Sequence, residues 1–171
     1  MAAIQELANE AERKKYLDRQ MLDLRQATQT LEDAILKIDG ETREQLTHTF
    51  NTVNMHFNAL FNTLFAGGQA KLELQGNEIL DNGLQVFAQP PGKKNTTIAL
   101  LSGGEKALTA IALVFAMFKL NPAPFCLMDE VDAPLDDSNT ERFCNLVKQM
   151  SEKTQFLFVS HNKVTMEMAQ H

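Results

Sequence analysis

Apolar residues recur at alternating intervals of four and three along the first part of the chain. The positions that share this register are Leu17, Met21, Leu24, Thr28, Leu31, Ile35 and Ile38, preceded by Leu7, Glu10 and Lys14. A repeat of about 3.5 residues forms a narrow seam along a helix, which a second helix covers in a coiled coil. We therefore expect one long helix over residues 3–48, held weakly near its start, where the seam is polar. An ordinary amphipathic helix on a domain surface is the alternative interpretation.

The pattern changes from Glu41 onward. The apolar residues that follow at helical spacing are Phe50, Val53, Phe57, Leu60, Phe61 and Leu64. A stripe of this kind is typical of a helix that packs on a core. Gly67 and Gly68 are expected to end that helix, because glycine readily adopts the left-handed conformation of a C-terminal cap. The pattern divides the chain into a coiled-coil helix over residues 1–48 and a folded part over residues 49–171.

The folded part alternates between short apolar runs and helical patterns, which predicts an α/β fold. Strands are expected at residues 71–74, 84–88, 125–128 and 156–159, with a turn at 81–83 between the first two. The last two runs are wholly apolar, as in buried parallel strands. A helix over 105–120 is apolar almost all round and is expected to be buried, and a second helix over 138–153 has Ser138 or Asn139 as its cap.

Composition limits the function classes. The chain has 171 residues, 44% apolar and 22% charged, which is enough to bury a core and excludes wholesale disorder. With 16 Lys and Arg against 22 Asp and Glu, the net charge of −6 cannot hold DNA by overall attraction, so any such contact is local or shared with a partner. No apolar run approaches the roughly 18 residues of a membrane span, and the charged start lacks the core of a signal peptide. Cys126 and Cys144 form no CxxC pair, which favours a reducing cytoplasm, with Cys126 as inert core.

A glycine pair opens the helix expected at 105–120. In Leu101-Ser102-Gly103-Gly104-Glu105, the glycines allow close approach of an anion to the backbone, and the helix start presents unpaired N–H groups. Ser102 is able to cap the helix and to donate to a phosphate oxygen. A plain serine cap after a tight turn is the alternative interpretation of this segment alone.

Two strand ends carry groups suited to phosphate chemistry. Residues 125–128 are followed by Asp129 and Glu130, which is the Walker B pattern of a buried strand that delivers carboxylates at its end. Asp129 would reach Mg²⁺ directly or through water, and Glu130 would act as general base on the attacking water. His161 ends the next strand, where an imidazole is able to contact the transferring phosphate. A solvated strand end is the alternative for the acid pair.

The phosphate-binding loop of such enzymes is missing. A P-loop has the pattern G-x-x-x-x-G-K-[ST], but the only Gly-Lys pair, Gly92-Lys93, is followed by Lys94 and preceded five residues earlier by Phe87. The chain therefore carries half of an ATP site. Lys93 and Lys94 have no acid near them in the sequence; a solvated loop is the favoured interpretation, with a DNA-backbone or phosphate contact as the alternative.

These motifs together resemble a known family. The segments LLSGGEKALTAIALVFAMFKLNPAPFCLMDEVDAPLDDSNTERF and FVSHNK, with FNTLFAGGQAKLEL and QPPGKK before them, resemble the C-terminal half of the head of bacterial SMC (structural maintenance of chromosomes) proteins. In that family the Walker A motif lies in the N-terminal half, and a long antiparallel coiled coil separates the halves. The resemblance implies an ABC-type ATPase head, with a P-loop NTPase-like sheet and flanking helices, in which residues 49–171 form the C-terminal half.

The resemblance also implies a role for each motif residue. The signature motif, Leu101 to Glu105, would reach the γ-phosphate of an ATP held by an opposing head. Asp129 and Glu130 would take the Walker B roles in the same head, Asp136 would lie at the head–head contact, and His161 would be the switch histidine. ATP and Mg²⁺ are the implied cofactors, and ATP hydrolysis is the implied reaction.

The implied partners are those of a chromosome segregation machine. They are the N-terminal half of the same protein, a second head in a homodimer, a kleisin with its accessory subunit, and DNA through the complex, in the cytoplasm at the nucleoid and without a membrane. The chain stops before the family's last strand residues and resembles a fragment, which we expect to be inactive alone because the P-loop is absent. The alternatives are the head of a RecN-like or other coiled-coil DNA-repair ATPase, or, for the fragment, a non-catalytic coiled-coil and kleisin interaction module.

Overall fold

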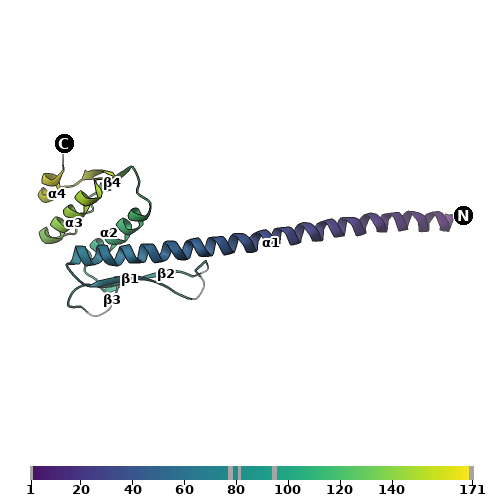
Figure 1. Ribbon diagram of the computed structural model, residues 1–171, viewed down its shortest axis with the longest axis horizontal. Coiled ribbons are helices and arrows are strands. Elements are labelled where there is room, and N and C mark those ends of the chain that lie inside the picture. Colours follow the sequence, from purple (N-terminus) through teal and green to yellow (C-terminus); the bar gives the residue numbers. More distant parts are fainter. Residues whose placement is uncertain (1, 77–78, 81, 94–95, 170–171) are drawn as a thin grey trace. The chain divides into compact units, whose positions relative to one another are not determined.

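The structure is a computed structural model that describes residues 2–76, 79–80, 82–93 and 96–169. Its helices are α1 (Ala2–Phe65), the short 3-10 helix η1 (Ile98–Leu100), α2 (Gly103–Leu120), α3 (Asp137–Met150) and α4 (Lys163–Met168), and its strands are β1 (Gln69–Leu74), β2 (Leu84–Gln89), β3 (Thr96–Thr97), β4 (Phe125–Asp129) and β5 (Gln155–Val159) (Figure 1). The described residues therefore form an α/β fold, as predicted. No helix among them combines the length and apolar character that crossing a membrane requires.

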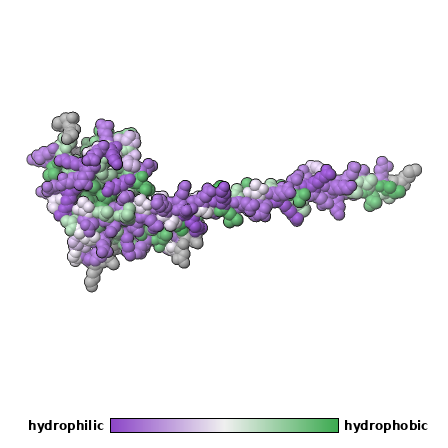
Figure 2. Space-filling view, in the orientation of Figure 1, coloured by the Kyte–Doolittle hydropathy of each residue, from purple (hydrophilic) through white to green (hydrophobic). Residues whose placement is uncertain are grey.

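Helix α1 spans both helical patterns without a break, so the expected end near residue 48 is wrong. The change in pattern after Glu41 alters which face is apolar and leaves the backbone helical. The chain nevertheless divides into two compact units, Met1–Gln45 and Leu46–His171. In the first unit the seam is exposed: Leu24 and Leu31 have 67% and 65% of their surface accessible. Figure 2 shows such hydrophobic side chains at intervals along an otherwise hydrophilic helix. The assignment of residues 1–48 to a coiled coil stays a prediction.

The second unit contains two small sheets. Strands β1, β2 and β3 form an antiparallel sheet in that order, and β4 pairs with β5 in parallel, which confirms the parallel arrangement expected from their apolar runs. The β1–β2 hairpin closes with a hydrogen bond of 2.9 Å from the Gln75 N–H to the Gly83 carbonyl. Asp81, in the turn expected at 81–83, lies outside the described residues.

The predicted stripe on the last part of α1 packs in the core of the second unit. Phe57, Phe61 and Leu64 are fully buried there, with Leu108 of α2 and Phe143 of α3 in the same cluster. The helix ends as expected at the glycine pair. Gly68 has φ of +84°, and an added Cβ would lie 2.4 Å from the carbonyl oxygen of Gln89, so no larger residue fits without a shift of the backbone.

The parallel sheet has one covered face and one open face. Phe156 and Phe158 of β5 contact Phe115 of α2 and Phe143 of α3, respectively. The opposite side chains are exposed, at 62% for Phe125, 66% for Leu127, 49% for Leu157 and 52% for Val159. The expectation of two fully buried strands is therefore wrong for this chain: the described residues supply cover for one face only.

Two expectations about the helices also need correction. Helix α2 is not buried all round, because Val114 and Met117 are each 50% exposed on the side away from the core. The cap of α3 is Asp136 and not Ser138 or Asn139: the Asp136 carboxyl accepts the Asn139 N–H at 2.8 Å. A carboxylate satisfies this unpaired N–H and complements the positive end of the helix.

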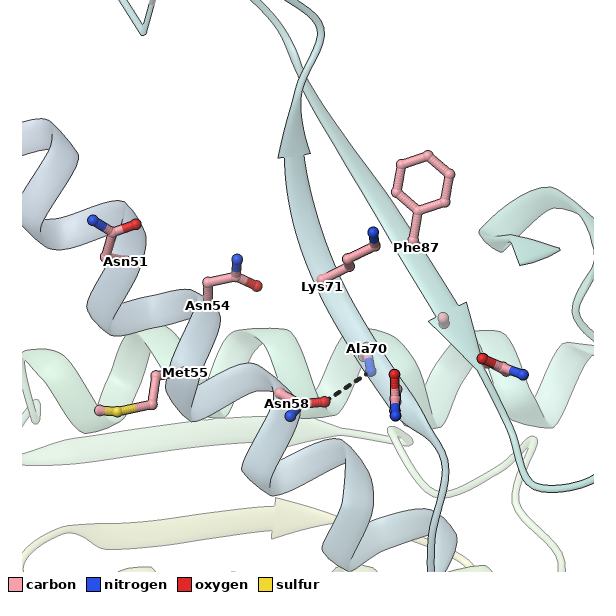
Figure 3. A pocket seen from close by; sticks show the side chains of 10 residues that line it. Asn51, Asn54, Met55, Asn58, Ala70, Lys71 and Phe87 are labelled. Carbon is pink, nitrogen blue, oxygen red and sulfur yellow. Dashed lines mark hydrogen bonds between the residues drawn. The ribbon is translucent and has the colours of Figure 1, made fainter. Parts of the chain in front are cut away.

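Asparagine side chains of α1 pair with the outer edge of β1. The Leu72 N–H donates to Asn54 Oδ1 at 2.9 Å, and Asn54 Nδ2 donates to the Leu72 carbonyl at 3.3 Å. One turn further along α1, Asn58 Oδ1 accepts the Ala70 N–H at 3.1 Å (Figure 3). The helix thus satisfies polar groups that an edge strand otherwise leaves unpaired.

Candidate active site

The signature segment forms a reciprocal cap at the start of α2. Ser102 Oγ accepts the Glu105 N–H at 3.4 Å, and a Glu105 carboxyl oxygen accepts the Ser102 N–H at 2.8 Å, so the predicted serine cap is confirmed as a capping box. Leu101, directly before it, is only 4% exposed and belongs to the core. Its buried side chain therefore holds the turn against the core, while Ser102 stays exposed.

The two glycines of the signature lie in different surroundings. A Cβ added to Gly104 would lie 2.8 Å from the carbonyl oxygen of Pro134, so the start of α2 packs directly on the loop that follows β4. A Cβ added to Gly103 would meet nothing within 4 Å. Gly104 is thus required for packing inside the chain, whereas the backbone at Gly103 is open to a molecule from outside.

Lys93 forms an ion pair with Glu105 of the signature turn. Its Nζ lies 2.7 Å and 2.9 Å from the two carboxyl oxygens of Glu105. This hydrogen bond, followed by the one from the Ser102 backbone, lowers the pKa of Glu105 below its ordinary value. Lys93 is exposed in its loop, as the favoured interpretation expected, but it is paired with an acid that is distant in sequence and adjacent in the fold. Lys94 lies outside the described residues.

The ends of β4 and β5 bring the candidate base and the candidate switch histidine together. His161 Nε2 lies 3.4 Å from Glu130 Oε1. Glu130 has φ of +49°, and its N–H donates to the Val159 carbonyl at 2.8 Å, so the chain turns sharply while still paired to β5. Asp129 is the last residue of β4, opposite Val159, and is exposed. These three side chains therefore share one edge of the sheet.

Asp136 lies beside the signature turn. It lines a cleft of about 520 Å³ together with Phe65, Pro90, Pro91, Ser102, Gly104, Glu105, Pro134 and Asn139. The structure thus places the predicted head–head contact residue and the signature residues around one hollow, although the role of Asp136 in such a contact stays a prediction.

The acidic side chains at the strand ends are suited to a metal ion that is bound together with a nucleotide, and less to a metal ion held by protein side chains alone. Among the described residues, no group of three or more His, Cys, Asp and Glu side chains could hold a metal ion. Mg²⁺ in nucleotide sites is bound through one or two carboxylates, with water and substrate phosphates as the other ligands. The exposed carboxylate of Asp129 fits that kind of site.

Sequence reasoning missed a buried acid between the two motifs. Asp132 is 3% exposed, and its Oδ2 accepts hydrogen bonds from Ser160 Oγ at 2.6 Å and from Thr165 Oγ1. The available signal was an additional acid two residues after Glu130 and, near His161, the two hydroxyl residues Ser160 and Thr165. Its burial depends on the packing of segments some 30 residues apart, which local patterns do not reveal.

The fold and the site define the class of protein. The chain belongs to the RecF/RecN/SMC family, because the family model described as "RecF/RecN/SMC N terminal domain" matches residues 1–171. Among the members of that family, it is 72% identical over 170 residues to the "Chromosome partition protein Smc" of Burkholderia pseudomallei, covering 99% of this chain. The chain spans 14% of the length of that relative and corresponds to part of its head region.

Solved structures support the same placement. A head domain with an extended coiled coil, bound to the C-terminal domain of ScpA and derived from Pyrococcus furiosus, superposes with a TM-score of 0.76 at 36% identity and covers 98% of this chain and 44% of that one. A structure from work on ATP-driven dimerization and DNA-stimulated activation of SMC ATPases has a TM-score of 0.70 at 41% identity and covers 74% of this chain and 78% of that one. SMC heads are ATPases, and the predicted kinship with bacterial SMC heads is confirmed.

Proposed function

We propose that this chain is the signature-bearing half of an SMC ATPase head, which hydrolyses ATP once a P-loop-bearing half completes it. The observation that carries the proposal is the 3.4 Å approach of His161 to Glu130 at the end of a parallel strand pair. Ligands of open α/β sheets bind at that edge. The contact between Gly104 and Pro134 places the signature turn against the loop that begins at Glu130.

Each side chain at the strand ends has a distinct task. Glu130 takes a proton from the attacking water, and His161 donates a hydrogen bond to the transferring phosphate and orients the base. Asp129 would hold Mg²⁺, directly or through water, and the bound ion would neutralise charge on the phosphates. The exposure of Glu130 and His161 supports this assignment, because nucleotide and water need access to both groups.

The signature turn acts on the ATP of a second head. Ser102 and the backbone around Gly103 face outward, where unpaired N–H groups at the start of α2 attract a phosphate. The carboxyl group of Glu105 at the same turn would repel that phosphate. The ammonium group of Lys93 on both carboxyl oxygens offsets this charge, so Lys93 belongs to the proposed site. Asp136 lies at the contact between the two heads.

The open face of the β4–β5 sheet receives the P-loop-bearing half. Exposed apolar side chains on adjacent strands are costly in water, and Leu127 and Leu157 are directly paired positions. An α/β sheet is ordinarily covered on both faces. The exposed seam of the first unit fits the second helix of an antiparallel coiled coil that connects the two halves.

The wider function follows the family. ATP binding clamps two heads together, hydrolysis releases them, and the cycle drives DNA entrapment, loop extrusion and chromosome segregation. The proposed partners are a second head, a kleisin of the ScpA type with its accessory subunit, and DNA through the complex. The proposed location is the cytoplasm, at the nucleoid. A homologous head bound to the ScpA C-terminal domain supports the kleisin assignment.

ATP turnover tests the proposal. The chain alone is expected to hydrolyse no ATP. Mixing or fusing it with a P-loop-bearing N-terminal half is expected to produce hydrolysis that depends on Glu130. Activity of the chain alone would reveal a phosphate site within it and contradict the split. A folded complex of both halves that does not hydrolyse ATP would overturn the proposal and favour an interaction module.

A further inference from the structure

We propose that Asp132 is a positioning residue that holds the general base Glu130 and the switch residue His161 in their mutual geometry. This inference rests on the proposed ATPase function for its kinetic consequence. Its structural content is independent of that function: one buried carboxyl oxygen ties the loop after β4 to the segment after β5.

The contact between Glu130 and His161 is too weak to determine by itself where the two side chains lie. The two side chains are 55% and 90% exposed, and a contact between such exposed groups contributes little because water competes for it and side-chain entropy opposes it. Glu130 also has a left-handed backbone conformation, at φ of +49°, which a residue with a Cβ adopts only when its surroundings impose it. Something more rigid must therefore determine where the two groups lie.

Asp132 provides that rigidity on the Glu130 side. It lies two residues after the base, inside a loop in which the Ala133 N–H donates to the Glu130 carbonyl at 3.2 Å and the Leu135 N–H donates to the Asp132 carbonyl at 3.0 Å. Its side chain is buried while that of Glu130 stays exposed. The loop thus has one side chain directed inward as an anchor and one directed outward for chemistry.

The hydroxyl partners of Asp132 bracket the histidine. Ser160 precedes His161, and Thr165 lies within α4, where it is 1% exposed. Ser160 Oγ also accepts the Asn162 N–H at 2.9 Å, and Asn162 caps α4 through the Val164 N–H at 2.9 Å. The segment that carries His161 is therefore fastened on both sides to a single carboxyl oxygen.

Burial of this carboxyl group argues for a specific role. A buried acid costs free energy unless its hydrogen bonds are complete, and an apolar residue of similar size would fill the site at less cost. Buried polar networks of this kind impose one geometry on the segments that they join. The segments joined here are the two that carry the proposed base and the proposed phosphate contact.

The kinetic test uses the assembled head, in which this chain is paired with the P-loop-bearing half. Asp132→Ala is expected to lower kcat about 10²-fold with little change in KM for ATP, because it displaces catalytic groups without touching the nucleotide. Asp132→Asn keeps an oxygen able to accept both hydroxyls and is expected to restore most of the rate. Glu152→Ala, an exposed acid before the opposite end of β5, is the matched control and is expected to leave kcat unchanged.

A double variant distinguishes positioning from general damage. Groups that act as a unit have non-additive effects on rate. Asp132→Ala added to Glu130→Gln is therefore expected to slow the reaction by a much smaller factor than Asp132→Ala does in the otherwise intact site, because only the placement of His161 is left to lose. Fully multiplicative losses in the double variant, or an Asn variant as slow as the Ala variant, would overturn the proposal.

Amide hydrogen exchange of this chain separates failure of the inference from failure of the proposed function. Asp132→Ala is expected to accelerate exchange at Asn162 and Val164, whose N–H groups depend on the fastened segment, whether or not the assembled head hydrolyses ATP. Unchanged exchange there would overturn the inference even in an active head. If Asp132→Ala does not fold, Ser160→Ala and Thr165→Val each remove one hydroxyl and are expected to cause a smaller acceleration of the same amides.

Discussion

His161 Nε2 and Glu130 Oε1 lie 3.4 Å apart, although each belongs to a different strand end and both side chains are largely in solvent. The parallel register between β4 and β5 aligns the two ends, because Asp129 pairs with Val159 and each chain then turns away from the sheet. The geometry of the proposed catalytic pair is thus a property of the strand pairing beneath it and of the Asp132 anchor.

Glu130→Gln is expected to slow ATP hydrolysis by the assembled head roughly 10²- to 10⁴-fold, the usual contribution of a general base. Glutamine keeps the size of the side chain and its capacity for hydrogen bonds, so ATP binding is expected to persist. Its amide group has little basicity and cannot take the proton from water. Single-turnover hydrolysis and equilibrium nucleotide binding, measured on the same preparation, check both statements. Unchanged turnover would remove Glu130 from the role of base.

Much of the fold could be predicted because its signals are local. The glycine pair at residues 67–68, the serine cap at Ser102 and the parallel strands at 125–128 and 156–159 each depend on residues close in sequence. The candidate site followed from the same kind of signal. Polar residues directly after buried-strand patterns predict a shared edge, and the structure brings Glu130 and His161 to that edge.

The features that the sequence did not predict depend on contacts between distant segments. The pairing of Lys93 with Glu105 and the burial of Asp132 beside Ser160 arise only when loops meet in the folded chain. The wrong expectation of buried strands at β4 and β5 has a different cause. Their wholly apolar sequence is suited to cover on both faces, and the described residues provide cover on one.

The glycines of the signature are expected to respond differently to the same substitution. Gly104→Ala would place a Cβ 2.8 Å from the Pro134 carbonyl oxygen and is expected to destabilise the chain by about 1–3 kcal/mol, the usual cost of overpacking. Gly103→Ala meets nothing within 4 Å and is expected to leave the free energy of unfolding unchanged or slightly raised. Urea unfolding of both variants measures the difference. Equal stability of the two would contradict the close contact between α2 and the Pro134 loop.

Removal of Lys93 is expected to have a pH-dependent effect on stability. Because the pKa of Glu105 is lowered in the folded chain, chiefly by its hydrogen bond from Lys93, the stabilisation is present above the ordinary Glu pKa and is lost as pH falls through the lowered value. Lys93→Met is therefore expected to cost about 1 kcal/mol or less at neutral pH, given the exposure of the pair, and nothing at strongly acidic pH. Urea midpoints across this range, with Lys153→Met as a control for general charge effects, test the sign. A constant difference at all pH values would show that Glu105 is not the partner that matters.

Asn54→Ala is expected to destabilise the second unit by about 1–3 kcal/mol, because it leaves the N–H and carbonyl of buried Leu72 without their partner. Asn51 lines, together with Asn54, the pocket between α1 and the β1–β2 strands that Figure 3 shows, and its side chain is exposed, so Asn51→Ala is expected to change stability by less than about 0.5 kcal/mol. Thermal or urea unfolding of the two variants forms the comparison. Similar losses in both would mean that the pairing of α1 with the β1 edge contributes little.

The open face of the β4–β5 sheet is expected to determine association with the P-loop-bearing half. Leu127 and Leu157 are exposed in this chain, so Leu127→Asp and Leu157→Asp are expected to leave its own folding nearly unchanged. If the missing half covers this face, each carboxylate must be buried without a partner on association, which costs far more than the loss of one leucine contact. The dissociation constant of the two halves, measured by calorimetry, is then expected to rise by at least about 10²-fold, corresponding to roughly 3 kcal/mol. Leu84→Asp places the same charge on an exposed position of β2 and is expected to have no such effect. An unchanged dissociation constant for Leu127→Asp and Leu157→Asp would exclude this face as the interface, whereas a loss confined to these two variants would explain why wholly apolar strands lie half-uncovered in the chain.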